Sequence, residues 1–206
     1  MASEDTPKRR RGRPALPPEQ QRRRLLDAAE RAFERSHFER ASVQDVVREA
    51  GMSSRSFYEF FDSKADLAAE LARDRAEAFV AQIAGVLLAA DGPVEGIDRV
   101  LHMYLEMLPV VVIDLEHLGG EAGDRVRAIR DEYRVRIQGV LTEAFRQIRE
   151  QGLIDEEPDP LAVELVIAGI ESLSIRFHHA GARDELLALH PQLLGAIRSL
   201  FPSYLG

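Results

Sequence analysis

The sequence predicts an all-α protein with a small N-terminal domain and a larger helical body. Apolar residues recur at spacings of three and four along most of the chain, as on the buried face of a helix. Glycine, proline and capping residues divide this pattern at intervals typical of helices, and no segment alternates as a strand does. With 206 residues, 45% of them apolar, the chain can bury a sizeable core.

Four helices are expected in the first 88 residues. The first covers 19–33 and follows two prolines, which can start a helix but not continue one. A second starts after Ser42, which forms a capping-box pattern with Asp45, and ends at Gly51. A third, short helix starts at Ser53 or Ser54 and carries three phenylalanines. The fourth opens with another capping pattern and continues from about 64 to 88.

The rest of the chain is expected to form further helices joined by short breaks. The predicted segments are a helix from 93 to 108, a valine-rich piece over 109–118, and helices over 121–151, 160–179 and 184–201. Asp159 and Pro160 supply an N-cap and a first-turn proline for the second of these three. Pro191 is expected to bend the last one.

Composition excludes several classes of protein. Without cysteine, disulfides and thiolate metal sites are impossible, and no histidine pair has a metal-ligand spacing. The longest apolar runs are short and contain carboxylates, so we expect no membrane span and a cytoplasmic protein. No nucleophile, phosphate-loop or carboxylate constellation predicts catalysis, so neither enzyme activity nor a cofactor is expected.

Charge is distributed unevenly along the chain. The net charge is -8, but residues 1–70 carry 14 Lys and Arg against 13 Asp and Glu. The remaining residues are strongly acidic, so phosphate contacts should be confined to the N-terminal part. The sequence KRRRGRP at 8–14 concentrates five cations in seven residues.

The stretch from 42 to 64 has the spacing of a helix-turn-helix. Gly51 can adopt the positive φ that a short turn between two helices requires. Met52 is expected to fill the angle between the helices, and Phe57 and Phe60 to anchor the second helix. The opposite face of that helix is then free to enter the major groove of DNA.

These residues resemble the N-terminal signature of the TetR family of bacterial transcriptional regulators. The matching motifs are AGMS at 50–53, FYEFF at 57–61 and SKADL at 63–67. The sequence departs from the signature at Val47, where alanine is usual, and at Glu59, where tyrosine or histidine is frequent. The resemblance implies a helix-turn-helix domain over 19–64 and a ligand-binding and dimerisation domain over 65–206.

The resemblance also implies which residues contact double-stranded DNA. Ser54, Arg55 and Ser56 would lie at base edges, with Arg55 the candidate for a two-bond contact to guanine. Phosphate contacts would come from four other side chains: Ser42, Ser53, Tyr58 and Lys64. The alternatives are a solvated arginine at 55 and an ordinary surface charge at 64.

The basic arm over 1–18 is expected to be disordered. Arg11 and Arg13 flank a glycine and precede a proline, which resembles the AT-hook core that inserts arginines into a narrow minor groove. The alternative is a polycation that adds only salt-sensitive, sequence-independent affinity. A nuclear localisation signal is a third reading, which the bacterial resemblance disfavours.

The helix predicted over 160–179 is apolar nearly all round, so both its sides should be covered. In the TetR family this helix and the last one form a homodimer interface. The expected contact residues, several of them small, are Leu165, Ala168, Gly169, Ser172, Leu186, Leu193 and Ile197. The alternative is a core within one chain.

The resemblance further implies a cavity for a small-molecule effector between the DNA-binding helices and this interface. Its candidate lining is apolar with a few polar tips: Phe79, Ile83, His102, Tyr104, Met107, Val111, Leu115, His117, Tyr133, Ile137 and Phe177. Each of these residues could equally serve the core. The function expected overall is a homodimeric repressor that a ligand releases from a near-palindromic operator; the alternative is an architectural DNA-binding protein without an effector.

Overall fold

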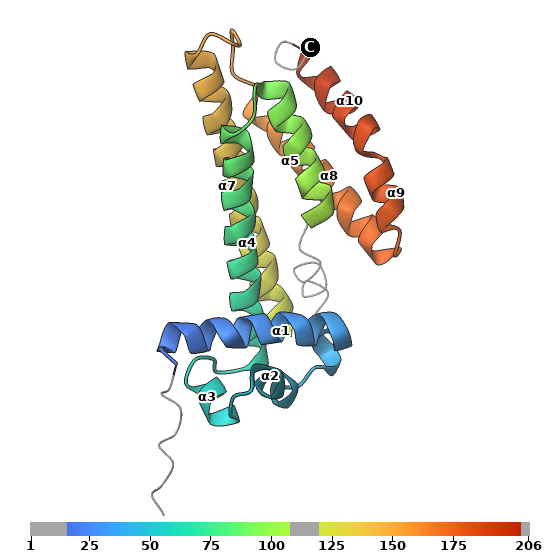
Figure 1. The fold of residues 1–206 in the computed structure, drawn as a ribbon. Coiled ribbons are helices and arrows are strands. Elements are labelled where there is room, and N and C mark those ends of the chain that lie inside the picture. The colour runs from blue at the N-terminus through green and yellow to red at the C-terminus, as the bar shows by residue number, and fades with distance from the viewer. Residues whose placement is uncertain (1–15, 108–119, 203–206) are drawn as a thin grey trace, which may run out of the picture.

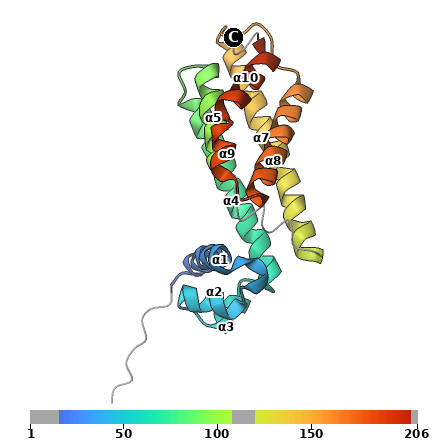
Figure 2. The same cartoon turned by 90° about the vertical axis from the view of Figure 1, so that its right-hand side faces the viewer.

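The computed structural model describes residues 16–107 and 120–202, and all the regular elements in these ranges are helices (Figure 1). Three short or medium helices form a separate layer at one end. The remaining helices stand as an elongated bundle on that layer, as both views show (Figures 1 and 2). Residues 1–15 of the basic arm and the valine-rich segment lie outside the described residues, whereas Pro18, the last residue of the predicted arm, starts the first helix.

The N-terminal layer consists of α1 (Pro18–Arg40), α2 (Val43–Ala50) and α3 (Ser54–Tyr58). The first helix continues past the predicted end at residue 33, because a kink at His37 (φ 57°, ψ 153°) joins a further turn to it. One hydrophobic core unites the three helices, since Leu25, Val46 and Phe57 are all fully buried. These contacts hold α2 and α3, which are too short to be stable alone.

Two long helices form the axis of the body. The helices α4 (Lys64–Leu88) and α7 (Gly120–Glu150) pack side by side over much of their length (Figure 1). The N-terminal end of α4 packs on α1, and its C-terminal, distal end packs on α5 (Pro93–Met107). A single helix therefore connects the N-terminal layer with the far end of the molecule.

The body is completed by α8 (Pro160–His179), α9 (Arg183–Ala188) and α10 (His190–Leu200). Asp159 caps α8 as predicted, since its carboxylate accepts a 2.8 Å hydrogen bond from the backbone N–H of Leu161. The expected single bent helix over 184–201 is instead two helices. The break lies at Leu189, and Pro191 falls in the first turn of α10, where its missing N–H costs no helical hydrogen bond.

Candidate DNA interface and effector pocket

The turn between α2 and α3 is fixed by caps on both sides. Ser42 and Asp45 form the predicted capping box, in which each side chain bonds the other residue's backbone N–H. Gly51 ends α2 with φ 60°, a conformation that only glycine adopts without strain. Ser53 then caps α3 by accepting a hydrogen bond from the N–H of Ser56. The second helix of the motif is thus held at a defined angle to the first.

The outer face of α3 carries the predicted base-reading residues. Phe57 is fully buried and anchors the helix, while the side chain of Arg55 is 91% exposed and makes only a 3.6 Å contact with Glu59. Ser54 accepts a 3.0 Å hydrogen bond from the amide of Gln44 on α2. Tyr58 is 59% exposed and packs edge-on against Phe57. This face is free to enter a groove of DNA.

The residues expected to contact phosphate occupy two kinds of site. The hydroxyl groups of Ser42 and Ser53 lie at helix N-termini, on the exposed surface, while they cap α2 and α3. Ser56 is close by, with its hydroxyl 2.9 Å from that of Ser53. Helix N-termini attract anions, so this edge of the motif suits a phosphate backbone.

Lys64, in contrast, is engaged within the protein. Its ammonium group donates 2.8 Å hydrogen bonds to the carbonyl oxygens of Phe38 and Ala41, and it lies 4.2 Å from the centroid of the Phe38 ring. Partial burial lowers the pKa of Lys64 from its ordinary value. The side chain therefore closes the end of α1 against the start of α4, a structural role that the sequence pattern alone did not reveal.

Ion pairs tie the first two helices together. Glu49 on α2 accepts hydrogen bonds of 2.9 Å from Arg31 and 2.8 Å from Arg35, both on α1. The bond from Arg35, followed by that from Arg31, lowers the pKa of Glu49. The motif is consequently braced against α1 as one unit.

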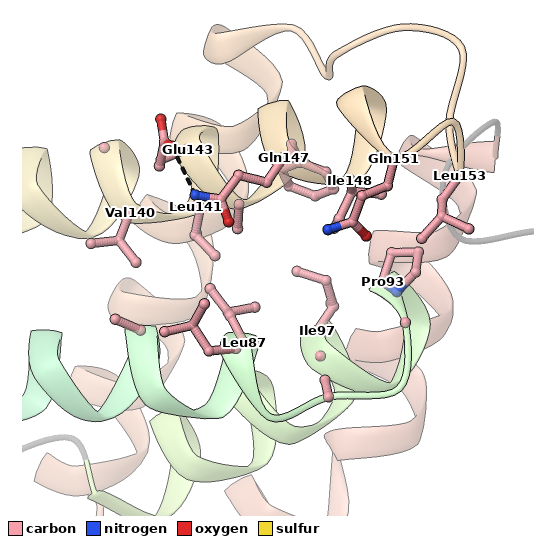
Figure 3. Close-up of a pocket in the computed structure, with 18 of the residues that line it drawn as sticks. Leu87, Pro93, Ile97, Val140, Leu141, Glu143, Gln147, Ile148, Gln151 and Leu153 are labelled. Carbon is pink, nitrogen blue, oxygen red and sulfur yellow. Dashed lines mark hydrogen bonds between the residues drawn. The ribbon is translucent and has the colours of Figure 1, made fainter.

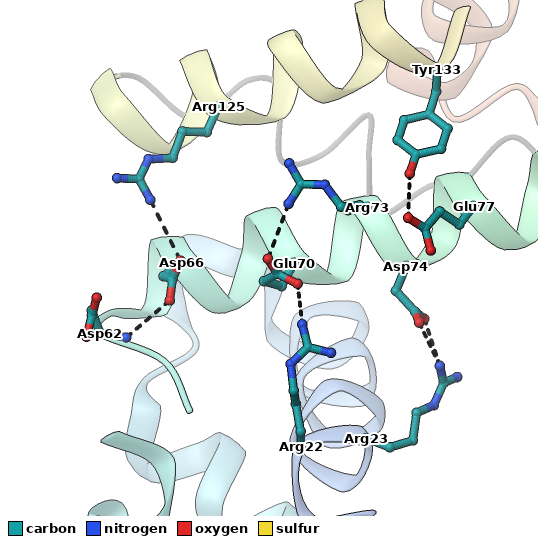
Figure 4. Close-up of polar contacts among 10 residues, drawn as sticks. All are labelled: Arg22, Arg23, Asp62, Asp66, Glu70, Arg73, Asp74, Glu77, Arg125 and Tyr133. Carbon is teal, nitrogen blue, oxygen red and sulfur yellow. Dashed lines mark hydrogen bonds and ion pairs between the residues drawn. The ribbon is translucent and has the colours of Figure 1, made fainter. Parts of the chain in front are cut away.

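A row of carboxylates on α4 joins this unit to the body (Figure 4). On one side Glu70 pairs with Arg22, and Asp74 accepts bonds of 2.8 and 2.9 Å from Arg23, both arginines belonging to α1. On the other side Glu77 accepts a 2.9 Å hydrogen bond from the hydroxyl group of Tyr133 on α7. A displacement of α4 relative to α7 would thus be felt by α1.

A large pocket opens at the distal end of α4, between that helix, α5 and α7 (Figure 3). Its volume is about 720 Å³, within the range of small-molecule sites. Leu87, Ile97 and Val140 contribute to its apolar walls, and Gln147 and Gln151 reach it from α7. An inner cavity of about 60 Å³ adjoins it and shares Ile97, Leu141 and Phe145 as walls.

The comparison with protein families bears on the N-terminal part. Residues 25–71 match the family model described as bacterial regulatory proteins of the tetR family. Residues 25–71 thus form a domain of the tetR family of bacterial regulatory proteins. No curated protein matches the sequence.

Solved structures share the fold of this chain at low sequence identity. A TetR-family regulator from Mesorhizobium loti is 18% identical, covers 90% of this chain and 98% of its own, and has a TM-score of 0.71. FadR from Bacillus subtilis, solved in complex with stearoyl-CoA, is 17% identical, with coverages of 85% and 96% and a TM-score of 0.66. Escherichia coli NemR is 15% identical, with coverages of 87% and 96% and a TM-score of 0.69. These proteins therefore share the fold of this chain over most of its length.

The residues predicted to line an effector cavity are dispersed. Ile83, Tyr104 and Ile137 line the inner cavity, and Phe79 is buried edge-on against Tyr104. None of the predicted residues lines the larger pocket as the structure describes it. Its walls come from residues that sequence reasoning did not single out, although two glutamines four apart beside apolar residues were a visible signal.

The polar candidates serve other contacts. Tyr133 is buried and donates to Glu77, while His102 is mostly exposed, 3.4 Å from Glu106 and edge-on to His190. Phe177 is half-buried against the core. The side chain of Met107 and the residues Val111, Leu115 and His117 lie outside the described part of the chain.

The predicted dimer residues fall into two groups. Leu165 is 65% exposed, and Gly169 and Ser172 follow it along the open side of α8. Leu186 and Ile197 are buried within the protomer, so they belong to its own core instead. Ala168 and Leu193 are half-buried, so their exposure is intermediate between those of the two groups.

The inner side of α8 is held by charge as well as by apolar contact. The buried carboxylate of Glu171 accepts a 2.8 Å hydrogen bond from Arg134 and lies 3.4 Å from Arg130, both on α7.

In the described ranges, no group of three or more His, Asp or Glu side chains is arranged to hold a metal ion. Nor is any helix in these ranges long and apolar enough to cross a bilayer.

Proposed function

We propose that this regulator is a homodimeric repressor, which leaves a near-palindromic operator when a small apolar or amphipathic molecule binds in the body. The observation that carries the proposal is the course of α4. Its distal end lines the large pocket with Ala84 and Leu87, and its first residue, Lys64, bonds the end of α1. Occupation of the pocket can therefore act on the DNA-reading unit through one helix.

DNA recognition is assigned to the outer face of α3 and the neighbouring helix N-termini. Arg55 is proposed to bind a guanine, while Ser54 and Ser56 contact adjacent base edges and Ser42, Ser53 and Tyr58 contact phosphate. The exposure of Arg55 and Tyr58 supports this assignment. The internal bonds of Lys64 favour a positioning role for that residue in place of a phosphate contact.

Dimerisation is assigned to the open side of α8, together with α10. Leu161, Leu165 and Leu200 expose large apolar side chains on these two helices, which favours burial against a second copy. A two-fold dimer would hold two copies of α3 about one DNA turn apart, so the operator should have two-fold symmetry.

Effector release follows from differential binding. A ligand shifts the equilibrium between DNA-competent and DNA-incompetent arrangements only if it binds the latter more tightly. The ion pairs from Glu70 and Asp74 to α1 supply the link by which an α4 displacement would turn α3. The stearoyl-CoA complex of FadR supports the capacity of this fold to hold an apolar molecule.

The proposal is tested by selecting genomic fragments with the purified full chain and with a chain that starts at Ala15. A repressor should enrich a near-palindromic site with both proteins, and footprinting should protect two half-sites about 10 bp apart. Enrichment that disappears with the arm, or binding without any preferred site, would favour the architectural alternative. An effector screen with the enriched site as probe then tests release.

A further inference from the structure

The large pocket is long as well as wide. Its lining on α7 extends from Arg136 to Gln151, which at about 1.5 Å per residue corresponds to about 22 Å along the helix. Most of the wall along this length is apolar, including Leu87, Ile97 and Val140. An elongated apolar molecule fits such a space better than a compact one.

Polar groups gather near one end of the pocket. Gln147 lies in the last turn of α7 and Gln151 directly follows its end, and both reach over the apolar wall beside Ile97 and Pro93 (Figure 3). The Gln147 amide nitrogen donates a 2.9 Å hydrogen bond to Glu143, which leaves its carbonyl oxygen available, and the Gln151 side chain makes no hydrogen bond within the described part of the chain. These two amides can therefore donate to and accept from one uncharged polar group.

Charge on the pocket wall disfavours ionised ligands. Arg136, the cation of this lining, lies 4.5 Å over the Tyr133 ring and about 16 Å along α7 from Gln147. Glu143 is negative and already paired with Arg146 at 2.6 Å, whereas Asp91 adds a second carboxylate to the lining. An anion would meet carboxylates at the amide end, and a cation would compete with Arg146 for Glu143.

We infer that this pocket binds an elongated, uncharged molecule with one hydroxyl, carbonyl or amide end group, which lies under Gln147 and Gln151. The apolar remainder extends along α7 toward Leu141 and Phe145, the walls shared with the inner cavity. Ligand binding in this pocket does not require DNA binding, but the role of the pocket as an effector site rests on the proposed function. It differs in charge from a coenzyme A thioester, the ligand named for B. subtilis FadR.

Calorimetric titration of the full chain with three ten-carbon probes tests this inference. The probes are decan-1-ol, decanoate and decyltrimethylammonium, each below its aggregation limit at pH 7.5. Decan-1-ol should bind at least tenfold more tightly than either ion. Decanoate or decyltrimethylammonium binding as tightly as the alcohol would overturn the assigned ligand class.

A pair of glycine variants locates the binding. Gly139 lines the pocket and Gly85 does not, while both lie in helices with open space around an added Cβ atom. Gly139→Leu should fill the pocket and weaken decan-1-ol binding at least tenfold, whereas Gly85→Leu should leave it unchanged. Equal binding by both variants would overturn the site. Gly139→Leu could block decan-1-ol binding while decan-1-ol leaves the operator affinity of the wild type unchanged. That result would support the site and contradict only the proposed release.

Discussion

The ammonium group of Lys64 lies 2.8 Å from the carbonyl oxygen of Ala41, so the first residue of α4 closes the end of α1. A second bond to the Phe38 carbonyl and a contact with the Phe38 ring complete this junction. These contacts join the DNA-reading unit to the helix that reaches the pocket. Lys64 thus connects the two parts of the molecule even without DNA.

Replacement of Lys64 by methionine should destabilise the protein. The change leaves two carbonyl oxygens without their donor, and we expect the free energy of unfolding in urea to fall by about 1–3 kcal/mol. If Lys64 served only as a phosphate contact, stability would be unchanged. The logarithmic salt dependence of DNA binding would instead decrease by about 0.9.

Arg55→Ala should affect recognition and leave the fold intact. Because the side chain is 91% exposed, unfolding free energy should change by less than about 0.5 kcal/mol. Discrimination between the operator and a site with one altered guanine should fall by about 1–3 kcal/mol. Competition binding measures this difference, and Arg146→Ala on α7 is the control. Undiminished discrimination would assign base reading to another residue.

The ion pairs that Glu49 forms with Arg31 and Arg35 predict that the stability of the fold depends on pH. Because these bonds lower its pKa, the folded state holds the carboxylate ionised at pH values where the unfolded chain binds a proton. The resulting stabilisation is complete above the ordinary value of 4.5 and is lost as the pH falls through the lowered pKa. Glu49→Gln should therefore be less stable than the wild type at pH 7.

Urea unfolding at a series of pH values from 7 to 3 measures this effect. The difference between wild type and Glu49→Gln should shrink toward the acid end. Glu156→Gln is the control, because this exposed carboxylate forms no ion pair within the described residues. A difference that stays constant over the series would assign the effect of Glu49→Gln to something other than ionisation.

Leu165→Glu should weaken the proposed dimer. The substitution places a charge on the apolar open side of α8, where Leu165 is 65% exposed in one protomer. Sedimentation velocity should show a shift toward monomer, and operator affinity should fall with it. Val135→Glu is the matched control, since Val135 is 66% exposed but lies on α7 and does not line the pocket. Equal sedimentation of both variants would place the interface elsewhere.

Local chemistry explains why the DNA-reading motif was predictable. The caps at Ser42 and Ser63 and the positive φ of Gly51 depend on residues close together in sequence, so the pattern specifies them. The burial of Phe57 follows from its position on a short helix with one apolar face. The same local reasoning placed the start of α8 at Pro160.

The pocket and the junction were less predictable because they depend on packing between distant segments. Nothing near Lys64 in the sequence indicates that Phe38 and Ala41 will present their carbonyl oxygens to it. Likewise, apolar residues of a helix can face a cavity, a core or a second chain, and the spacing is the same in each case. The family resemblance predicts Leu186 at the dimer interface, but it is buried within the protomer.

We propose that one pocket controls one sequence-specific DNA complex through α4. The most direct test measures the affinity of the full chain for its selected operator, with and without decan-1-ol, for the wild type, Gly139→Leu and Gly85→Leu. The alcohol should weaken the complexes of the wild type and Gly85→Leu and leave that of Gly139→Leu unchanged. The same weakening in all three proteins, or in none, would contradict it.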